Sequence, residues 1–226
     1  MTSNRQFRLL VFDWDGTLMD SSATIAACMT ESFRDLGVEA PSEEAIRSTI
    51  GLGLGEVLQR LAPSFSEDDR RRWRAAYRKH WFGTYRERPA LFARAAETIA
   101  ELAGLDYWLA VATGKGRPGL DRDLEVTGLS RYFLTSRTAD DAPSKPHPQM
   151  LLDIMEELGV GGAETLMIGD TTFDLAMAQS AGAAAVGVLT GAHPRSQLMG
   201  CEPLECLQDV TELPGWLGRG TAESKP

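Results

Sequence analysis

The sequence predicts an α/β protein with a doubly wound, Rossmann-like parallel sheet and an inserted α-helical domain. Strand-like apolar runs occur at residues 8–12, 107–112, 165–168 and 184–188, with a weaker run at 132–136. Helical patterns lie between these runs, and such alternation is typical of a parallel sheet covered by helices. The segment 13–106 contains no convincing strand and is far longer than a single crossover helix requires. We therefore expect an inserted helical domain between the first two strong strands.

We place this helical domain at residues 19–87 and the Rossmann-like core at residues 1–18 and 88–226. Ser21-Ser22 is a turn or capping signal at the start of the insert, and Pro89 precedes the next helical pattern at 93–102. Within the insert, helical patterns cover residues 24–36, 43–49, 55–61 and 67–85. We expect hinges between the two parts near residues 18–20 and 86–89.

Composition narrows the class of protein further. With 226 residues, of which 43% are hydrophobic, the chain can build a sizeable core without stabilising disulfide bonds. The cysteines lack the even count and the spacing of a disulfide or zinc framework, so we expect free thiols in a reducing compartment at Cys28, Cys201 and Cys206. The polar N-terminus and the lack of a long apolar run predict a cytoplasmic protein. The net charge of −9 disfavours nucleic-acid and membrane partners, so an anionic substrate needs local positive charge.

One helical segment combines basic and aromatic residues, a composition also found in nucleic-acid binders. Its aromatic residues Trp73, Tyr77 and Trp81 recur at every fourth position, which predicts an apolar stripe that faces a helical core. We expect its basic residues on the solvent side: Arg70, Arg71, Arg72, Arg74, Arg78 and Lys79. A glycine-rich segment at residues 51–55 follows a helix and lacks the P-loop lysine, so we predict a flexible loop that touches substrate if it faces the sheet.

Four segments that carry chemistry should converge where parallel strands end. They are Asp13 with Asp15, then Thr113-Gly114-Lys115, then Lys145-Pro146, and finally the segment 169–174. Carboxylates, a hydroxyl, an ammonium group and glycines suit a phosphoryl-transfer site. Carboxylate oxygens favour Mg²⁺, whereas a hydroxyl, a backbone N–H and a lysine can bind the non-bridging phosphoryl oxygens. Two carboxylates at i and i+2 can divide the roles of nucleophile and proton shuttle.

In order and spacing, the motifs resemble those of the haloacid dehalogenase-like hydrolase superfamily. The resemblance is to its phosphatases of the phosphoglycolate phosphatase type, which carry a small helical cap after the first motif. It covers nearly the whole chain and rests on Asp13-Trp14-Asp15-Gly16-Thr17, Val111-Ala112-Thr113-Gly114, Lys145-Pro146 and Gly169-Asp170-Thr171-Thr172-Phe173-Asp174. The acid at position 15 indicates phosphate esters, because dehalogenases and phosphonate-cleaving relatives lack it.

The resemblance implies a role for each of these residues. Asp13 would attack phosphorus and form an aspartyl-phosphate, while Asp15 would protonate the leaving alkoxide and then activate water. Mg²⁺ would be held by Asp13, Asp170 and the backbone carbonyl of Asp15. The phosphoryl oxygens would be bound by Thr113, Gly114 and Lys145, of which Thr113 and Lys145 count with the two aspartates as catalytic. Asp174 would orient Lys145 or a water on the metal.

The expected function is that of a Mg²⁺-dependent phosphatase acting on a small phosphorylated metabolite, with phosphoglycolate as the first candidate. A phosphosugar mutase of the β-phosphoglucomutase type is the alternative among enzymes. A non-catalytic binding protein that uses residues 70–81 as its contact surface is the alternative in another class. We expect Lys115 and Arg117 to be solvated and His147 and His193 to lie in loops. Oligomeric state is not readable from the sequence.

Overall fold

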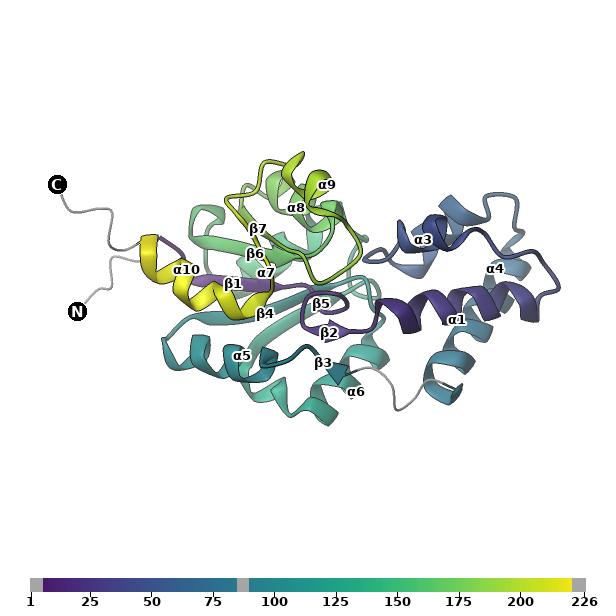
Figure 1. Ribbon diagram of the computed structural model, residues 1–226, viewed down its shortest axis with the longest axis horizontal. Helices are drawn as coiled ribbons and strands as arrows, with labels where there is room; N and C mark the ends of the chain where they lie inside the picture. The colour runs from purple at the N-terminus through teal and green to yellow at the C-terminus, as the bar shows by residue number, and fades with distance from the viewer. Residues whose placement is uncertain (1–5, 85–89, 221–226) are drawn as a thin grey trace.

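The computed structural model describes residues 6–84 and 90–220 and contains a six-stranded parallel sheet (Figure 1). The strands run in the order β5-β4-β1-β6-β7-β8. Their bounds are Phe133–Thr138 (β5), Trp108–Thr113 (β4), Leu9–Phe12 (β1), Thr165–Gly169 (β6), Ala184–Val188 (β7) and Cys206–Leu207 (β8). The predicted α/β fold class is confirmed, and β8 is a strand that the sequence pattern did not predict.

The central strand β1 is completely buried, because helices cover both faces of the sheet. Leu10 and Phe12 point into one apolar cluster, whereas Leu9 and Val11 point into another. The first cluster is covered by helices α5 (Ala95–Gly104), α6 (Arg117–Thr127) and α10 (Leu213–Gly220). The second is covered by α7 (Gln149–Leu158), α8 (Thr172–Ser180) and α9 (Arg195–Met199). A continuous apolar run therefore forms β1 because neither of its faces meets water.

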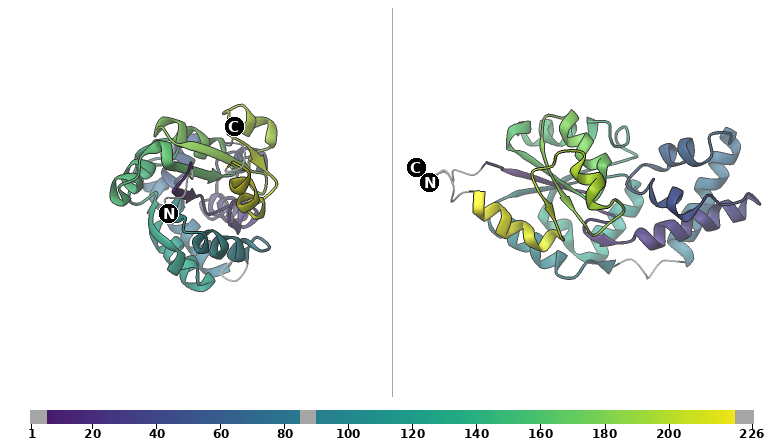
Figure 2. Two further views of the ribbon diagram at one scale, coloured as in Figure 1. Left: turned by 90° about the vertical axis from the view of Figure 1, so that its left-hand side faces the viewer. Right: turned by 45° about the horizontal axis from the view of Figure 1, so that its top comes forward.

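The inserted segment forms a helical unit beyond one end of the sheet, as Figure 1 and the right-hand view of Figure 2 show. It contains α1 (Ser22–Asp35), α2 (Glu43–Arg47), α3 (Leu54–Leu61) and α4 (Glu67–Lys79), and a π-helical turn at His80–Thr84 follows α4. These helices enclose a separate apolar cluster in which Trp73 packs on Phe33 with ring centroids 5.4 Å apart. The predicted fold class, a parallel sheet with an inserted helical domain, is confirmed by this arrangement.

Two short strands join the helical unit to the core. Strand β2 (Met19–Asp20) pairs antiparallel with β3 (Ala90–Leu91), so the chain leaves and re-enters the core side by side. The sequence did not predict these strands, because two residues are too few to show a periodic pattern. The second predicted hinge, at residues 86–89, lies outside the described residues. Within the described ranges, none of the helices combines the length and the apolar character that a membrane span needs.

Candidate active site

Asp13 follows β1 directly and forms a buried ion pair with Lys145. The Lys145 Nζ atom lies 2.5 Å from Asp13 Oδ1 and 2.6 Å from Asp174 Oδ1, and the Lys145 side chain is fully buried. Burial alone would lower the pKa of Lys145, but the charges of Asp13 and Asp174 raise it above its usual value. Burial raises the pKa of Asp13 strongly, and Lys145 opposes this effect. The lysine therefore favours the ionised form of the Asp13 carboxyl group.

Asp170 follows β6 and completes a cluster of three buried carboxylates. Asp13, Asp170 and Asp174 each offer an oxygen atom, and these atoms lie within 4.8 Å of one another. Asp170 accepts hydrogen bonds from Thr17 Oγ1 at 3.0 Å and from the backbone N–H of Ala192 at 2.8 Å. Burial, together with the charge of Asp174, raises the pKa of Asp170 to about 7. Carboxylates so close together are stabilised by a cation between them.

This cluster fits a hard divalent cation such as Mg²⁺, which binds oxygen ligands. The Asp13 Oδ2 atom is buried and has no hydrogen-bond partner among the described residues, so it can accept a metal ion. Asp174 lies within the cluster and pairs directly with Lys145. It is also held by Thr171, whose hydroxyl donates to Asp174 Oδ2 at 2.6 Å. Asp174 is thus in position both to orient Lys145 and to contribute an oxygen to the cluster.

Thr113 and Gly114 lie at the end of β4, where the helical unit contacts the core. Thr113 is buried, and its hydroxyl accepts a hydrogen bond from the backbone N–H of Lys115 at 3.2 Å. A Cβ atom on Gly114 would lie 2.4 Å from the carbonyl oxygen of Gly51, so only glycine allows this approach. On the same loop, the Gly53 N–H donates to Ser144 Oγ at 2.8 Å. The glycine-rich loop therefore docks beside Thr113 and Lys145, facing the carboxyl end of the sheet.

Asp15 is held by a second buried ion pair, which the sequence did not predict. Lys115 Nζ lies 2.9 Å from Asp15 Oδ1 and 3.2 Å from Asp123 Oδ2. Ser21 Oγ donates to Asp15 Oδ1 at 2.6 Å, and Trp14 Nε1 donates to Asp123 at 3.0 Å. Only 8% of the Lys115 side chain is exposed, so the expectation of a solvated lysine is wrong. Burial opposes the charge of Lys115, but Asp15 and Asp123 raise its pKa overall.

Lys115 is buried because of contacts that arise only in the tertiary structure. The ring of Trp81, from the helical unit, lies over Lys115 Nζ at 4.0 Å and keeps water from one side of it. Arg117 remains about one third exposed and pairs with Asp141. His147 is exposed in a loop, whereas His193 lies in a buried loop position and accepts a hydrogen bond from the Thr172 N–H. In the sequence, only the position of Lys115 next to the Thr113-Gly114 motif indicated that this lysine lies at the site.

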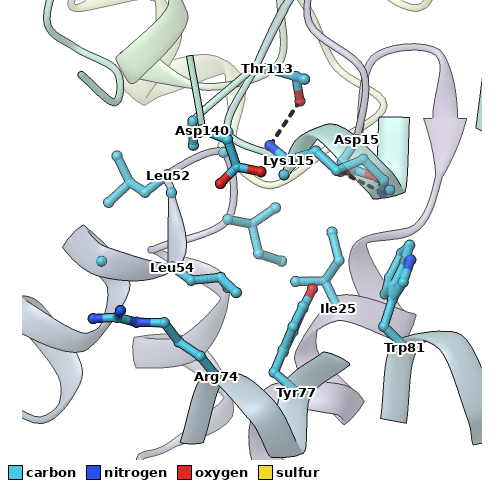
Figure 3. Close-up of a pocket in the computed structure, with 18 of the residues that line it drawn as sticks. Asp15, Ile25, Leu52, Leu54, Arg74, Tyr77, Trp81, Thr113, Lys115 and Asp140 are labelled. Atoms are coloured by element: carbon cyan, nitrogen blue, oxygen red, sulfur yellow. Dashed lines mark hydrogen bonds and ion pairs between the residues drawn. The ribbon is translucent and has the colours of Figure 1, made fainter. Parts of the chain in front are cut away.

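A pocket of about 450 Å³ lies between the helical unit and the core (Figure 3). The core contributes Asp13, Asp15, Thr113, Gly114 and Lys115 to its lining. The helical unit contributes apolar and aromatic side chains, together with two arginines: Ile25, Met29, Leu52, Leu54, Tyr77, Trp81, Arg74 and Arg78. Two expectations for residues 70–81 are therefore corrected. Tyr77 and Trp81 face the pocket as well as their own cluster, and Arg74 and Arg78 line the pocket rather than only the solvent side.

The fold and the site define a Rossmann-like α/β protein with a buried carboxylate–lysine centre that faces a helical unit. Residues 10–188 match the family described as Haloacid dehalogenase-like hydrolase, so the chain belongs to this family. A Dickeya dadantii protein named "Probable phosphatase IndB" is 39% identical over 214 residues, which cover 92% of each chain. A Vibrio parahaemolyticus protein named phosphoglycolate phosphatase is 29% identical, with 93% of this chain and 96% of that protein covered.

The solved structures share the fold. One described as a predicted phosphoglycolate phosphatase from Haemophilus somnus 129pt superposes with a TM-score of 0.85 at 24% identity. The match covers 94% of this chain and 99% of that chain. The predicted family and the prediction of an enzyme of the phosphatase type are confirmed by these comparisons.

Proposed function

We propose that the protein is a Mg²⁺-dependent phosphatase that hydrolyses a small phosphomonoester through an aspartyl-phosphate on Asp13. The observation that carries this proposal is the buried centre in which Asp13 faces both Lys145 and the carboxylates of Asp170 and Asp174. Lys145 favours the ionised, nucleophilic form of Asp13, although burial opposes it. Mg²⁺, when bound by Asp13, Asp170 and the Asp15 backbone carbonyl, would offset the negative charge of the phosphate group.

Each residue then has a chemical role in two steps. In the first, an Asp13 carboxylate oxygen attacks phosphorus and the ester P–O bond breaks. Asp15, which must be protonated at this point, gives its proton to the leaving alkoxide. In the second, Asp15 accepts a proton from water as that water attacks phosphorus, which releases phosphate and restores Asp13. Thr113, Gly114 and Lys145 bind the non-bridging oxygens, where negative charge accumulates. Asp174 positions Lys145, which lies 2.6 Å away.

The helical unit at residues 19–87 acts as a cap over this centre. It closes the pocket with residues of α1, α3 and α4, and its glycine-rich loop rests on Gly114. The paired strands β2 and β3 form the connection about which the cap can move. Closure excludes bulk water while the aspartyl-phosphate forms, and opening admits substrate and releases product.

Phosphate release from a panel of small phosphomonoesters, with and without Mg²⁺, tests the proposal. The panel includes phosphoglycolate, because the Vibrio relative is named for this substrate. We expect Mg²⁺-dependent release that is lost in Asp13→Asn, and thermal unfolding of the variant shows that its fold is retained. Isomerised sugar phosphates without net release would favour the mutase. If neither the wild type nor Asp13→Asn turned over any ester, the result would favour a non-catalytic binding protein.

A further inference from the structure

The basic residues of α4 fall into two sets that differ in their partners. Arg70, Arg71 and Arg72 pair with acids one turn earlier, at Glu67, Asp68 and Asp69. Lys79 pairs with Asp35 of α1 at 3.3 Å. Arg74 and Arg78 have no ion pair with any described residue, and both line the pocket. The arginines without an acid partner are therefore those that face the expected leaving group.

Arg74 and Arg78 are well placed to act together. They are four residues apart on α4, which places them on the same face of the helix. The Arg74 Nε atom is buried without a hydrogen-bond partner among the described residues, and a buried donor in this state costs free energy until it is satisfied. A guanidinium group binds carboxylate or phosphate oxygens through paired hydrogen bonds.

The charge of the cap side of the pocket is also favourable to an anion. Among the described cap residues in the lining, Glu56 is the one acid, against the two arginines. Figure 3 shows Arg74 on the side of the pocket opposite Thr113 and Asp15. An anionic group near the arginines would therefore lie away from the catalytic carboxylates, which would repel it.

The part of the pocket between the two arginines and the catalytic carboxylates is apolar and large. Ile25, Met29, Leu52 and Leu54 line it with the ring of Tyr77, and the pocket volume is about 450 Å³. This volume lies within the range of roughly 300–1,000 Å³ that is usual for pockets binding ligands of many atoms. The two-carbon leaving group of phosphoglycolate would contact little of this apolar surface. A leaving group with a ring or an equivalent carbon skeleton would contact much more of it.

We propose that Arg74 and Arg78 form an anion subsite in the cap. The preferred substrates are phosphomonoesters with an apolar carbon skeleton of about the size of a ring and a second anionic group at the far end. The second group is a carboxylate or a phosphate, since a guanidinium group binds both. This inference rests on the phosphatase activity proposed above, because it specifies the leaving group of that reaction.

Steady-state kinetics on matched aryl phosphates tests the subsite. The probes are phenyl phosphate, 4-carboxyphenyl phosphate, 4-(carboxymethyl)phenyl phosphate, 4-(phosphonomethyl)phenyl phosphate and phosphoglycolate. We expect at least one of the doubly anionic aryl esters to exceed phenyl phosphate about tenfold or more in kcat/KM, mainly through KM. The carboxylate and phosphonate esters show which anion the subsite prefers. Phosphoglycolate should be the poorer substrate, because its short leaving group does not span the pocket.

The double variant Arg74→Met/Arg78→Met should reduce this preference to less than about twofold. The matched control is Arg71→Met/Arg72→Met, which removes two exposed, acid-paired arginines from the same helix and should keep the full preference. Thermal unfolding of both double variants verifies that α4 is intact. The subsite would be overturned if the wild type shows no preference for the doubly anionic esters, if Arg74→Met/Arg78→Met retains that preference, or if the control loses it equally. In each of these cases, phosphate release would still support the phosphatase activity. No release from any ester would overturn both.

Discussion

The raised pKa of Asp170 predicts that the metal-free protein loses stability as pH rises. The pKa of Asp170 is about 7 in the folded protein, chiefly because of burial, against 3.8 for the ordinary group. Below pH 4 the carboxyl is protonated in both states, so it adds no pH dependence. Between pH 4 and 7 the unfolded chain releases a proton that the folded protein retains, and unfolding is increasingly favoured. The full difference of about three pKa units corresponds to roughly 4 kcal/mol, of which about 3 kcal/mol falls above pH 5.

Urea denaturation in EDTA at pH 5 and pH 8 measures this loss. Asp170→Asn cannot ionise, so its unfolding free energy should fall less between these pH values, by about 3 kcal/mol relative to the wild type. Asp106→Asn is the matched control, because Asp106 is exposed and asparagine tolerates its positive φ. Mg²⁺ at a hundred times its dissociation constant should restore about 3 kcal/mol to the wild type at pH 8. Equal losses in the wild type and Asp170→Asn would refute the reasoning.

Two further substitutions test the contacts around the site. Lys115→Met leaves the carboxylates of Asp15 and Asp123 without their cation, so we expect a loss of about 3 kcal/mol in unfolding free energy and at least a tenfold fall in kcat. An unchanged kcat in a folded Lys115→Met protein would show that Asp15 does not need this lysine. Gly114→Ala places a Cβ atom against the Gly51 carbonyl and should lower kcat/KM about tenfold or more. Gly215→Ala, whose Cβ meets nothing within 4 Å, is its control, and equal kinetics in both variants would contradict a role for the cap contact.

The sequence predicted the strands of the sheet that are long and buried. Strands β1 and β6 lie between other strands and under helices on both faces, so their apolar runs are continuous. The four motifs were recognisable because each follows or adjoins such a run, and the fold brings these strand ends together. Strands β2, β3 and β8 have two residues each, and pairing with distant chain segments forms them. A local pattern contains no information about that pairing.

The roles of Lys115 and Arg74 depend on the tertiary structure in the same way. Lys115 is buried because Asp15, which lies 100 residues away in sequence, and the cap residue Trp81 both reach it. The helical period of α4 separates an apolar stripe from a polar face, but it does not predict which polar residues face the core across the pocket. Arg74 and Arg71 are the same residue type one turn apart, and only the docking of the cap on the core distinguishes them.

Chemical trapping of the covalent intermediate tests the central claim most directly. Protein that is turning over the best ester of the panel with Mg²⁺ is quenched in acid and treated with borohydride, which reduces an acyl phosphate to an alcohol. The peptide that contains residue 13 is then analysed by mass spectrometry. We predict homoserine in place of Asp13, and no such product without substrate or without Mg²⁺. Phosphate release with Asp13 unmodified, or with the reduced residue at another position, would contradict the account.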